Sequence, residues 1–287
     1  MRKSIRTSPK LEGAEVLLGS ESVYRYLDAL GVSRPPASLR GLKQLVLAQL
    51  TRVPFENISK LYYKKQYGFA DMPSLARYLE GIEKYHFGGT CYANNFHFYR
   101  LLVSLGFEAK LCAADMATPD VHAVIMVTVD GREYLVDAGY AAPFLEPLPR
   151  DLRTDQVVAL GGDRYVLRPQ DEAGRSRLEL YRNDVLKHGY VAKPAPRKIG
   201  DFRQVIADSF RPEATFLNSI LVTRFFPGCS IVVHNLSLIQ SQGEYCEIRS
   251  LRKTDEMVAA IQEHIGIPGE IVVGAVADLT EMQDAWG

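Results

Sequence analysis

One cysteine of the chain has a setting that suits a nucleophile. Cys91 follows the pair Gly88-Gly89 and precedes a segment in which Phe96, Tyr99 and Val103 recur at helical spacing. The spacing predicts that Cys91 lies in the first turn of a helix, where unpaired backbone N–H groups and the helix dipole favour a thiolate. The two glycines let the backbone and a substrate approach the sulfur closely.

A cysteine nucleophile needs a base, and the base needs a group that fixes its tautomer. His122 begins an apolar, β-branched run, and residues 133–137 read Glu-Tyr-Leu-Val-Asp as a returning strand. The dipeptide Asp130-Gly131 between the two is a hairpin turn signal. Folding the strands about that turn sets position 124 opposite Asp137, so that His122 becomes its diagonal neighbour on the same face. The pattern therefore predicts a His122–Asp137 pair.

Four segments, taken together and in this order, resemble the arylamine N-acetyltransferase family. They are Val53-Pro54-Phe55-Glu56-Asn57, Gly88-Gly89-Thr90-Cys91-Tyr92, His122 with its apolar strand, and Tyr134-Leu135-Val136-Asp137-Ala138-Gly139-Tyr140. The resemblance runs over about residues 20 to 240. It implies a triad of Cys91, His122 and Asp137 in a papain- or transglutaminase-like core. It also implies that an acetyl or other short acyl group passes from acetyl-coenzyme A, through an acyl-cysteine, to an arylamine, hydrazine or N-hydroxyarylamine.

The resemblance further implies that Phe55, Gly89, Thr90 and Tyr140 contact the substrates. As structure alone, Phe55 would be an anchor of the core, whereas the resemblance suggests an aromatic wall over the thiol. The chain departs from the family pattern just before the two glycines. The family usually has an arginine there and this chain has Phe87, so the Glu and Asn of the segment 53–57 need other partners.

The same three residues would also serve other kinds of protein. An amide synthase or a thioester hydrolase would keep the triad and take its acyl group from a different donor or give it to water. A transglutaminase-like enzyme or a thiol protease shares the Cys–His–Asp logic. A non-catalytic relative would retain the residues for packing alone.

The rest of the chain predicts an α+β fold in three parts. Residues 1–86 form an N-terminal helical bundle, in which Ser20, Ser38 and Ser74 are candidate N-caps. Residues 87–193 hold the cysteine helix and several short strands, which predict a small central β-barrel or a curled sheet. A stiff linker, Pro194-Ala195-Pro196-Arg197-Lys198, leads to an α/β lid over residues 194–287.

Composition limits the partners. Lys+Arg and Asp+Glu both number 34, so no net charge recruits nucleic acid or an anionic membrane. No apolar run is long enough to span a bilayer, and the basic residues 1–6 lack the apolar core of a signal peptide, so we expect a cytoplasmic protein. The four cysteines have no zinc-site spacing, so we expect reduced thiols and no metal. The expected partners are a coenzyme A thioester and a small amine, bound by a monomer or a homodimer.

Overall fold

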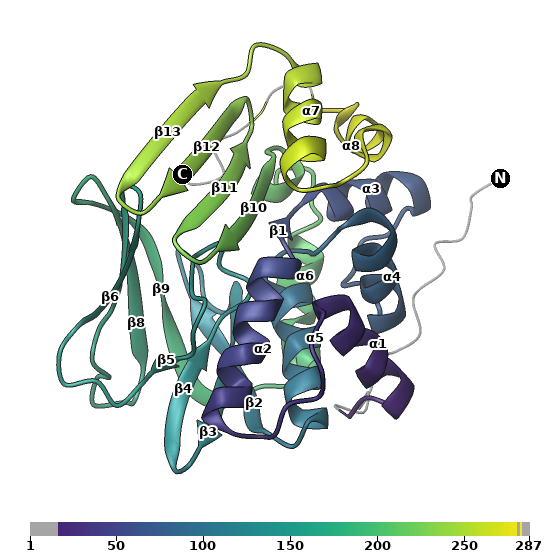
Figure 1. Cartoon of the computed structure of the whole chain (residues 1–287). Helices are drawn as coiled ribbons and strands as arrows, with labels where there is room; N and C mark the ends of the chain where they lie inside the picture. The colour runs from purple at the N-terminus through teal and green to yellow at the C-terminus, as the bar shows by residue number, and fades with distance from the viewer. Residues whose placement is uncertain (1–16, 280–281, 283–287) are drawn as a thin grey trace.

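The first part of the chain is helical, as predicted. The computed structural model describes residues 17–279 and 282, so the basic segment 1–6 lies outside the described residues. Figure 1 shows the helices of this part gathered on one side of the sheets. They are α1 (Ser20–Leu30), α2 (Leu39–Arg52), α3 (Ile58–Tyr67), α4 (Leu75–Tyr85) and α5 (Cys91–Ser104).

Two of the three predicted N-caps are confirmed. The Ser38 side chain accepts a hydrogen bond from the backbone N–H of Gly41, and Ser74 accepts one from Arg77. The prediction for Ser20 is wrong, because Ser20 is the first helical residue and Gly19 is the N-cap. Each confirmed cap satisfies a backbone N–H that has no partner inside its helix.

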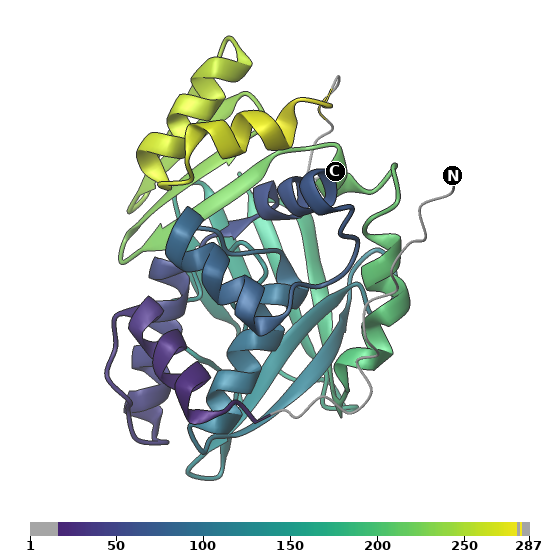
Figure 2. The same ribbon diagram turned by 90° about the vertical axis from the view of Figure 1, so that its right-hand side faces the viewer.

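The middle of the chain forms an eight-stranded antiparallel sheet. Its order is β5-β4-β3-β2-β9-β8-β7-β6, which has two ends, so the sheet is curled and open and not a closed barrel. Figure 2 shows its curvature beside the helices. The strands are β2 (Glu108–Asp115), β3 (His122–Val129), β4 (Arg132–Val136), β5 (Leu148–Pro149), β6 (Gln156–Leu160), β7 (Asp163–Leu167), β8 (Ser176–Arg182) and β9 (Val185–Pro196).

A second sheet has five antiparallel strands and is covered by the last helices. In sequence, the short helices η1 (Ile199–Phe202), α6 (Arg203–Asp208) and η2 (Thr215–Leu217) separate β9 from the C-terminal strands of this sheet. Its order is β1-β10-β11-β12-β13, so a strand from the N-terminal part joins the C-terminal sheet. The elements are β1 (Phe55–Glu56), β10 (Leu221–Phe226), β11 (Cys229–His234), β12 (Ser237–Gln242), β13 (Tyr245–Ser250), α7 (Thr254–His264) and α8 (Gly269–Val276).

The predicted linker is partly strand, since residues 194–196 are the end of β9. The three-part division at residues 86 and 193 stays a prediction.

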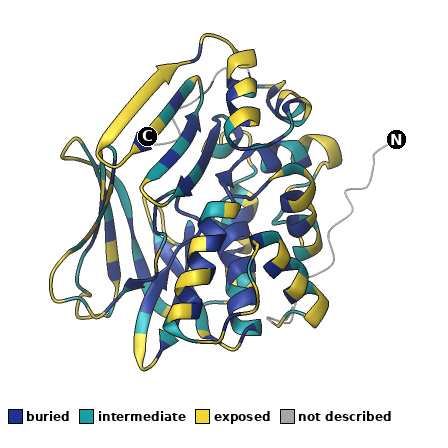
Figure 3. Cartoon of the chain, in the orientation of Figure 1, coloured by how far each residue is buried: buried dark blue, intermediate teal, exposed yellow. Residues whose placement is uncertain are grey.

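The candidate site lies against the most buried strand. All but one residue of β3 are buried, and α5 packs against β2 and β3, which explains why the His122 strand reads as a nearly continuous apolar run. Figure 3 shows this buried centre, and an exposed edge at β13. Among the described residues, no helix is long and apolar enough to cross a membrane.

Candidate active site

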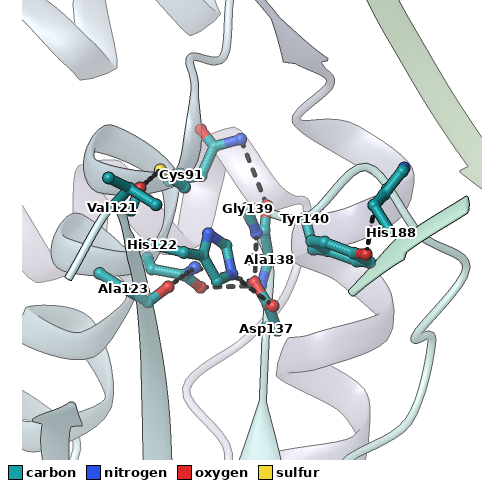
Figure 4. Close-up of polar contacts among 11 residues, drawn as sticks. Cys91, Val121, His122, Ala123, Asp137, Ala138, Gly139, Tyr140 and His188 are labelled. Carbon is teal, nitrogen blue, oxygen red and sulfur yellow. Dashed lines mark hydrogen bonds and ion pairs between the residues drawn. The ribbon is translucent and has the colours of Figure 1, made fainter. Parts of the chain in front are cut away.

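Cys91 is the first residue of α5, as its spacing predicts. Thr90 is the N-cap in an extended conformation, and its side chain makes no capping hydrogen bond. The first N–H groups of the helix therefore stay available to a negative charge near the sulfur. The thiol is partly exposed, and its sulfur lies 3.9 Å from the carbonyl oxygen of Val121, just before His122 (Figure 4).

The glycines before Cys91 are required by close packing. A Cβ on Gly88 would lie 1.9 Å from the carbonyl oxygen of Pro54, and one on Gly89 would lie 2.8 Å from the Cβ of Ala93. The loop of residues 88–90, the cysteine loop, is thus packed tightly against the segment 53–57, one of the four segments with the family pattern.

The predicted His122–Asp137 pair is present. Strands β3 and β4 pair with Ile125 opposite Val136, the register that the turn at 130–131 sets. The Nε2 of His122 lies 2.8 Å from an Oδ of Asp137, and both side chains are buried. Figure 4 shows the ring of His122 between Cys91 and the carboxylate of Asp137.

The pair holds opposite charges in the protein interior. Burial lowers the pKa of His122, but attraction and a hydrogen bond to Asp137, together with the Cys91 sulfur, raise it to about 10. For Asp137, burial raises the pKa, and the histidine and the hydrogen bonds to the carboxylate outweigh that effect and lower it. At neutral pH the site therefore holds an imidazolium beside a carboxylate, next to the thiol.

Two asparagines that the sequence analysis missed hold the parts of the site together. Asn95 donates to Asp137 and to the carbonyl of Ala123, at 2.9 and 2.6 Å, and accepts from the backbone N–H of Ala138 at 2.8 Å. Asn94 donates to backbone carbonyls of the cysteine loop and of Ala138. Their signal in the sequence is position: they lie three and four residues after Cys91, on the same side of its helix.

The partners that Glu56 and Asn57 need in the absence of the family's arginine are backbone groups. The two oxygens of Glu56 accept from the N–H groups of Gly88 and Ser59, at 3.1 and 2.8 Å. Asn57 accepts from the N–H of Leu221, the first residue of β10, at 3.0 Å. Phe87, which replaces the arginine, is buried in a cluster of aromatic rings. Burial raises the pKa of Glu56.

Phe55 and Tyr140, two of the predicted substrate-contact residues, each contact a neighbour of Cys91, and their contact with a substrate stays a prediction. Phe55 is buried, with its ring edge-on to Phe216 at 5.7 Å, and its backbone bridges to Gly89. Tyr140 packs against the His122 ring at 5.6 Å and is hydrogen-bonded to His188 (Figure 4).

Gly89 and Thr90 line a small cavity of about 40 Å³ together with Lys60. The Lys60 amine bonds the Ser209 hydroxyl at 2.8 Å and lies over the Phe210 ring. Within residues 17–279, no three side chains of His, Cys, Asp or Glu are grouped to hold a metal ion.

The chain is similar to known proteins in both sequence and fold. The sequence profile of a family described as N-acetyltransferase matches residues 38–271. Human arylamine N-acetyltransferase 1 is 29% identical over 137 residues, which are 44% of this chain and 46% of that protein. The matched segment thus spans less than half of that relative's length.

A second relative and a solved structure extend the likeness over more of the chain. Proansamycin X synthase of Amycolatopsis mediterranei is 27% identical over 189 residues, which cover 61% of this chain and 70% of that protein. The structure of Mycobacterium marinum arylamine N-acetyltransferase in complex with CoA superposes with a TM-score of 0.75 at 21% identity. It covers 90% of this chain and 99% of that one, so the two share a fold.

Proposed function

Because this chain belongs to the arylamine N-acetyltransferase family, we propose that it transfers an acetyl group from acetyl-coenzyme A to an arylamine nitrogen. Other short acyl groups, and hydrazines or N-hydroxyarylamines, are the related donors and acceptors. The observation that carries the proposal is the buried His122–Asp137 pair, 2.8 Å apart, beside a cysteine at the start of α5. Acetyl-coenzyme A is a co-substrate here, and no metal is needed for the steps below.

In the first step Cys91 attacks the thioester carbonyl as a thiolate, whose proton is on the His122 imidazolium. The bond from the carbonyl carbon to the coenzyme A sulfur breaks as the bond to Cys91 forms, and coenzyme A leaves as its thiol with a proton from the His122 imidazolium. We assign the oxyanion to the N–H groups of the first turn of α5, which the Thr90 side chain leaves uncapped, at about 3 kcal/mol for each donor. The product is an acetyl-cysteine.

In the second step the amine nitrogen attacks that acetyl group. His122, now neutral, removes the proton from the nitrogen, the amide bond forms, and the Cys91 sulfur is released. Asp137 stabilises the imidazolium each time it forms, and Asn95 keeps Asp137 in place. Each cycle passes through a covalent intermediate, so the kinetics should be ping-pong.

Intact-mass measurement after mixing with acetyl-coenzyme A alone tests the proposal. We expect one acetyl adduct that is absent in Cys91→Ala and present in Cys246→Ala, since Cys246 is an exposed thiol distant in sequence from the proposed nucleophile. Addition of 4-methylaniline should remove the adduct and yield the amide. No adduct on wild-type protein would contradict the proposal.

A second candidate shares the triad but not the acyl donor. Proansamycin X synthase is among the relatives, so a synthase that takes its acyl group from another thioester fits the same geometry. A hydrolase would differ by losing the adduct to water without an amine. The decay of the adduct with and without 4-methylaniline separates transfer from hydrolysis.

A further inference from the structure

The five-stranded sheet ends in a strand that is open along its outer edge. Strand β13 (Tyr245–Ser250) pairs with β12 on one side and, in the part of the chain that the structure describes, with no strand on the other. All of its residues are exposed, as Figure 3 shows. An open edge of this kind offers unpaired N–H and C=O groups to a further strand.

The turn before β13 fixes which of its backbone groups point outward. Residues 243–244 form a two-residue hairpin turn, so Gln242 and Tyr245 close it as a hydrogen-bonded pair. Along antiparallel strands, hydrogen-bonded and non-hydrogen-bonded positions alternate. The odd-numbered residues of β13 therefore direct their N–H and C=O groups to β12, and the even-numbered residues direct theirs to the open edge. The even-numbered residues are Cys246, Ile248 and Ser250.

The side chains of β13 include two opposite charges on one face. Glu247 and Arg249 are two residues apart, so they point to the same side of the sheet. Both are exposed, and neither has an ion pair or a side-chain hydrogen bond among the described residues. Edges that avoid pairing carry Lys, Pro or a bulge, whereas β13 has no Lys or Pro and an unbroken register with β12. Its exposed apolar residues are Tyr245 and Ile248, at 85% and 65%.

These charges favour one register for two copies of β13 that pair edge to edge. Because only the even-numbered residues have free backbone groups, they must lie opposite even-numbered residues of the other copy. With Ile248 opposite Ile248, each Glu247 lies opposite the partner's Arg249. A shift by two residues one way sets Glu247 opposite Glu247, and the other way sets Arg249 opposite Arg249. Opposite charges across a strand pair stabilise it and like charges destabilise it.

We propose that this chain forms a twofold-symmetric dimer in which β13 pairs antiparallel with β13 of a second copy, Ile248 opposite Ile248. Each copy supplies both members of the charge pair, as a self-complementary interface requires. The outward backbone groups of β13 gain partners, and the two five-stranded sheets join into one. A pair of six-residue strands buries less area than a stable interface needs, so the dissociation constant should be on the order of 10 µM. The dimer does not depend on the proposed function.

Charge reversal, followed by sedimentation velocity over a range of concentrations, tests the pairing. Glu247→Arg sets arginine opposite arginine at both symmetric positions, and Arg249→Glu sets glutamate opposite glutamate, so each should weaken the dimer at least tenfold. The double variant exchanges the two charges and should restore it. Both positions are exposed, so the variants should fold normally. Glu172→Arg, an equal change of charge at an exposed turn of the other sheet, is the matched control.

Amide hydrogen exchange, followed by NMR, checks the register. The outward N–H of Ile248 should exchange more slowly in concentrated than in dilute wild type, whereas that of Glu247, already bonded to β12, should change little. A wild type that is monomeric at about 500 µM would overturn the proposal and leave the edge to a strand of another protein. A dimer that survives both single reversals, or that the double variant does not restore, would overturn it as well.

Discussion

Replacement of Asp137 by asparagine isolates the charge of the carboxylate, because the amide keeps its shape. In the protein the pKa of His122 is raised to about 10 against burial, mainly by Asp137, from an ordinary value of 6.5. That difference is worth about 5 kcal/mol of preference for the imidazolium, at about 1.4 kcal/mol for each tenfold change. Without the carboxylate, burial should take the pKa of His122 below 6.5. The ring is then neutral at pH 7, and we expect acylation of Cys91 to slow by about 10⁴-fold.

The pKa of His122 can be followed by NMR of its ring, assigned by comparison with His122→Ala. Asp151→Asn is the matched control, because that carboxylate is exposed and pairs with Arg132. A His122 pKa that stays near 10 in Asp137→Asn would refute the reasoning. It would mean that another group holds the imidazolium.

The same pair also makes stability depend on pH. Because the folded-state pKa of His122 is raised, its contribution to the free energy of unfolding is complete below pH 6.5 and is lost as the pH rises towards about 10. The lowered pKa of Asp137 gives a contribution that is present above pH 3.8 and lost as the pH falls below it. The difference in unfolding free energy between wild type and Asp137→Asn, measured in urea, should therefore be largest between pH 3.8 and pH 6.5. It should decline as the pH rises towards 10.

Three further outcomes are expected. Gly139→Ala should lower the unfolding free energy by about 1 to 3 kcal/mol in urea titration, because its Cβ would meet Cys91 at 2.5 Å, whereas Gly200→Ala, with open space around it, should not. Burial lowers the pKa of His97 to about 3, so below pH 6.5 the unfolded chain takes up a proton on this ring that the folded protein does not. Between pH 6.5 and pH 5 the free energy of unfolding of wild type should therefore fall by about 2 kcal/mol more than that of His97→Gln. Burial lowers the pKa of Lys60 to about 8 although the Cys91 charge opposes this. Lys60→Met should therefore slow iodoacetamide alkylation of Cys91 severalfold at pH 7 but hardly at pH 10, where the wild-type amine is itself neutral. Equal rates for the two proteins at pH 7 would mean that Lys60 does not act on the thiol.

The parts of the site that the sequence predicted are those fixed by local geometry. A two-residue turn sets the register of its strands, so the contact between His122 and Asp137 follows from residues 130 and 131. A Gly-Gly pair before a helical pattern likewise places Cys91 at a helix start. The curled sheet was foreseen as one of two alternatives, because many short strands with regular turns have few other ways to bury one face.

The parts that the sequence did not predict depend on contacts between distant segments. No local pattern after Pro54 predicts a strand at residues 55–56, which form β1 by pairing with β10, more than 160 residues later. The roles of Asn94 and Asn95 depend on carbonyls that the fold brings to them from Gly89, Ala123 and Ala138. A cavity of about 280 Å³ lined by residues of both sheets has no local signal in the sequence at all.

The pairing of Phe55 with Thr223 also sets an order in time. A ribosome delivers Cys91, His122 and Asp137 well before it delivers β10, so for that interval Phe55 has no strand beside it. The cysteine loop, which bridges to Phe55 through Gly89, lacks its outer support for as long. Since a growing chain folds from its N-terminal end, the thiol can be present for many seconds before its surroundings are complete. The nascent protein therefore carries Cys91 before β10 is available to pair with Phe55. Formation of the second sheet completes the support of the loop that precedes the thiol.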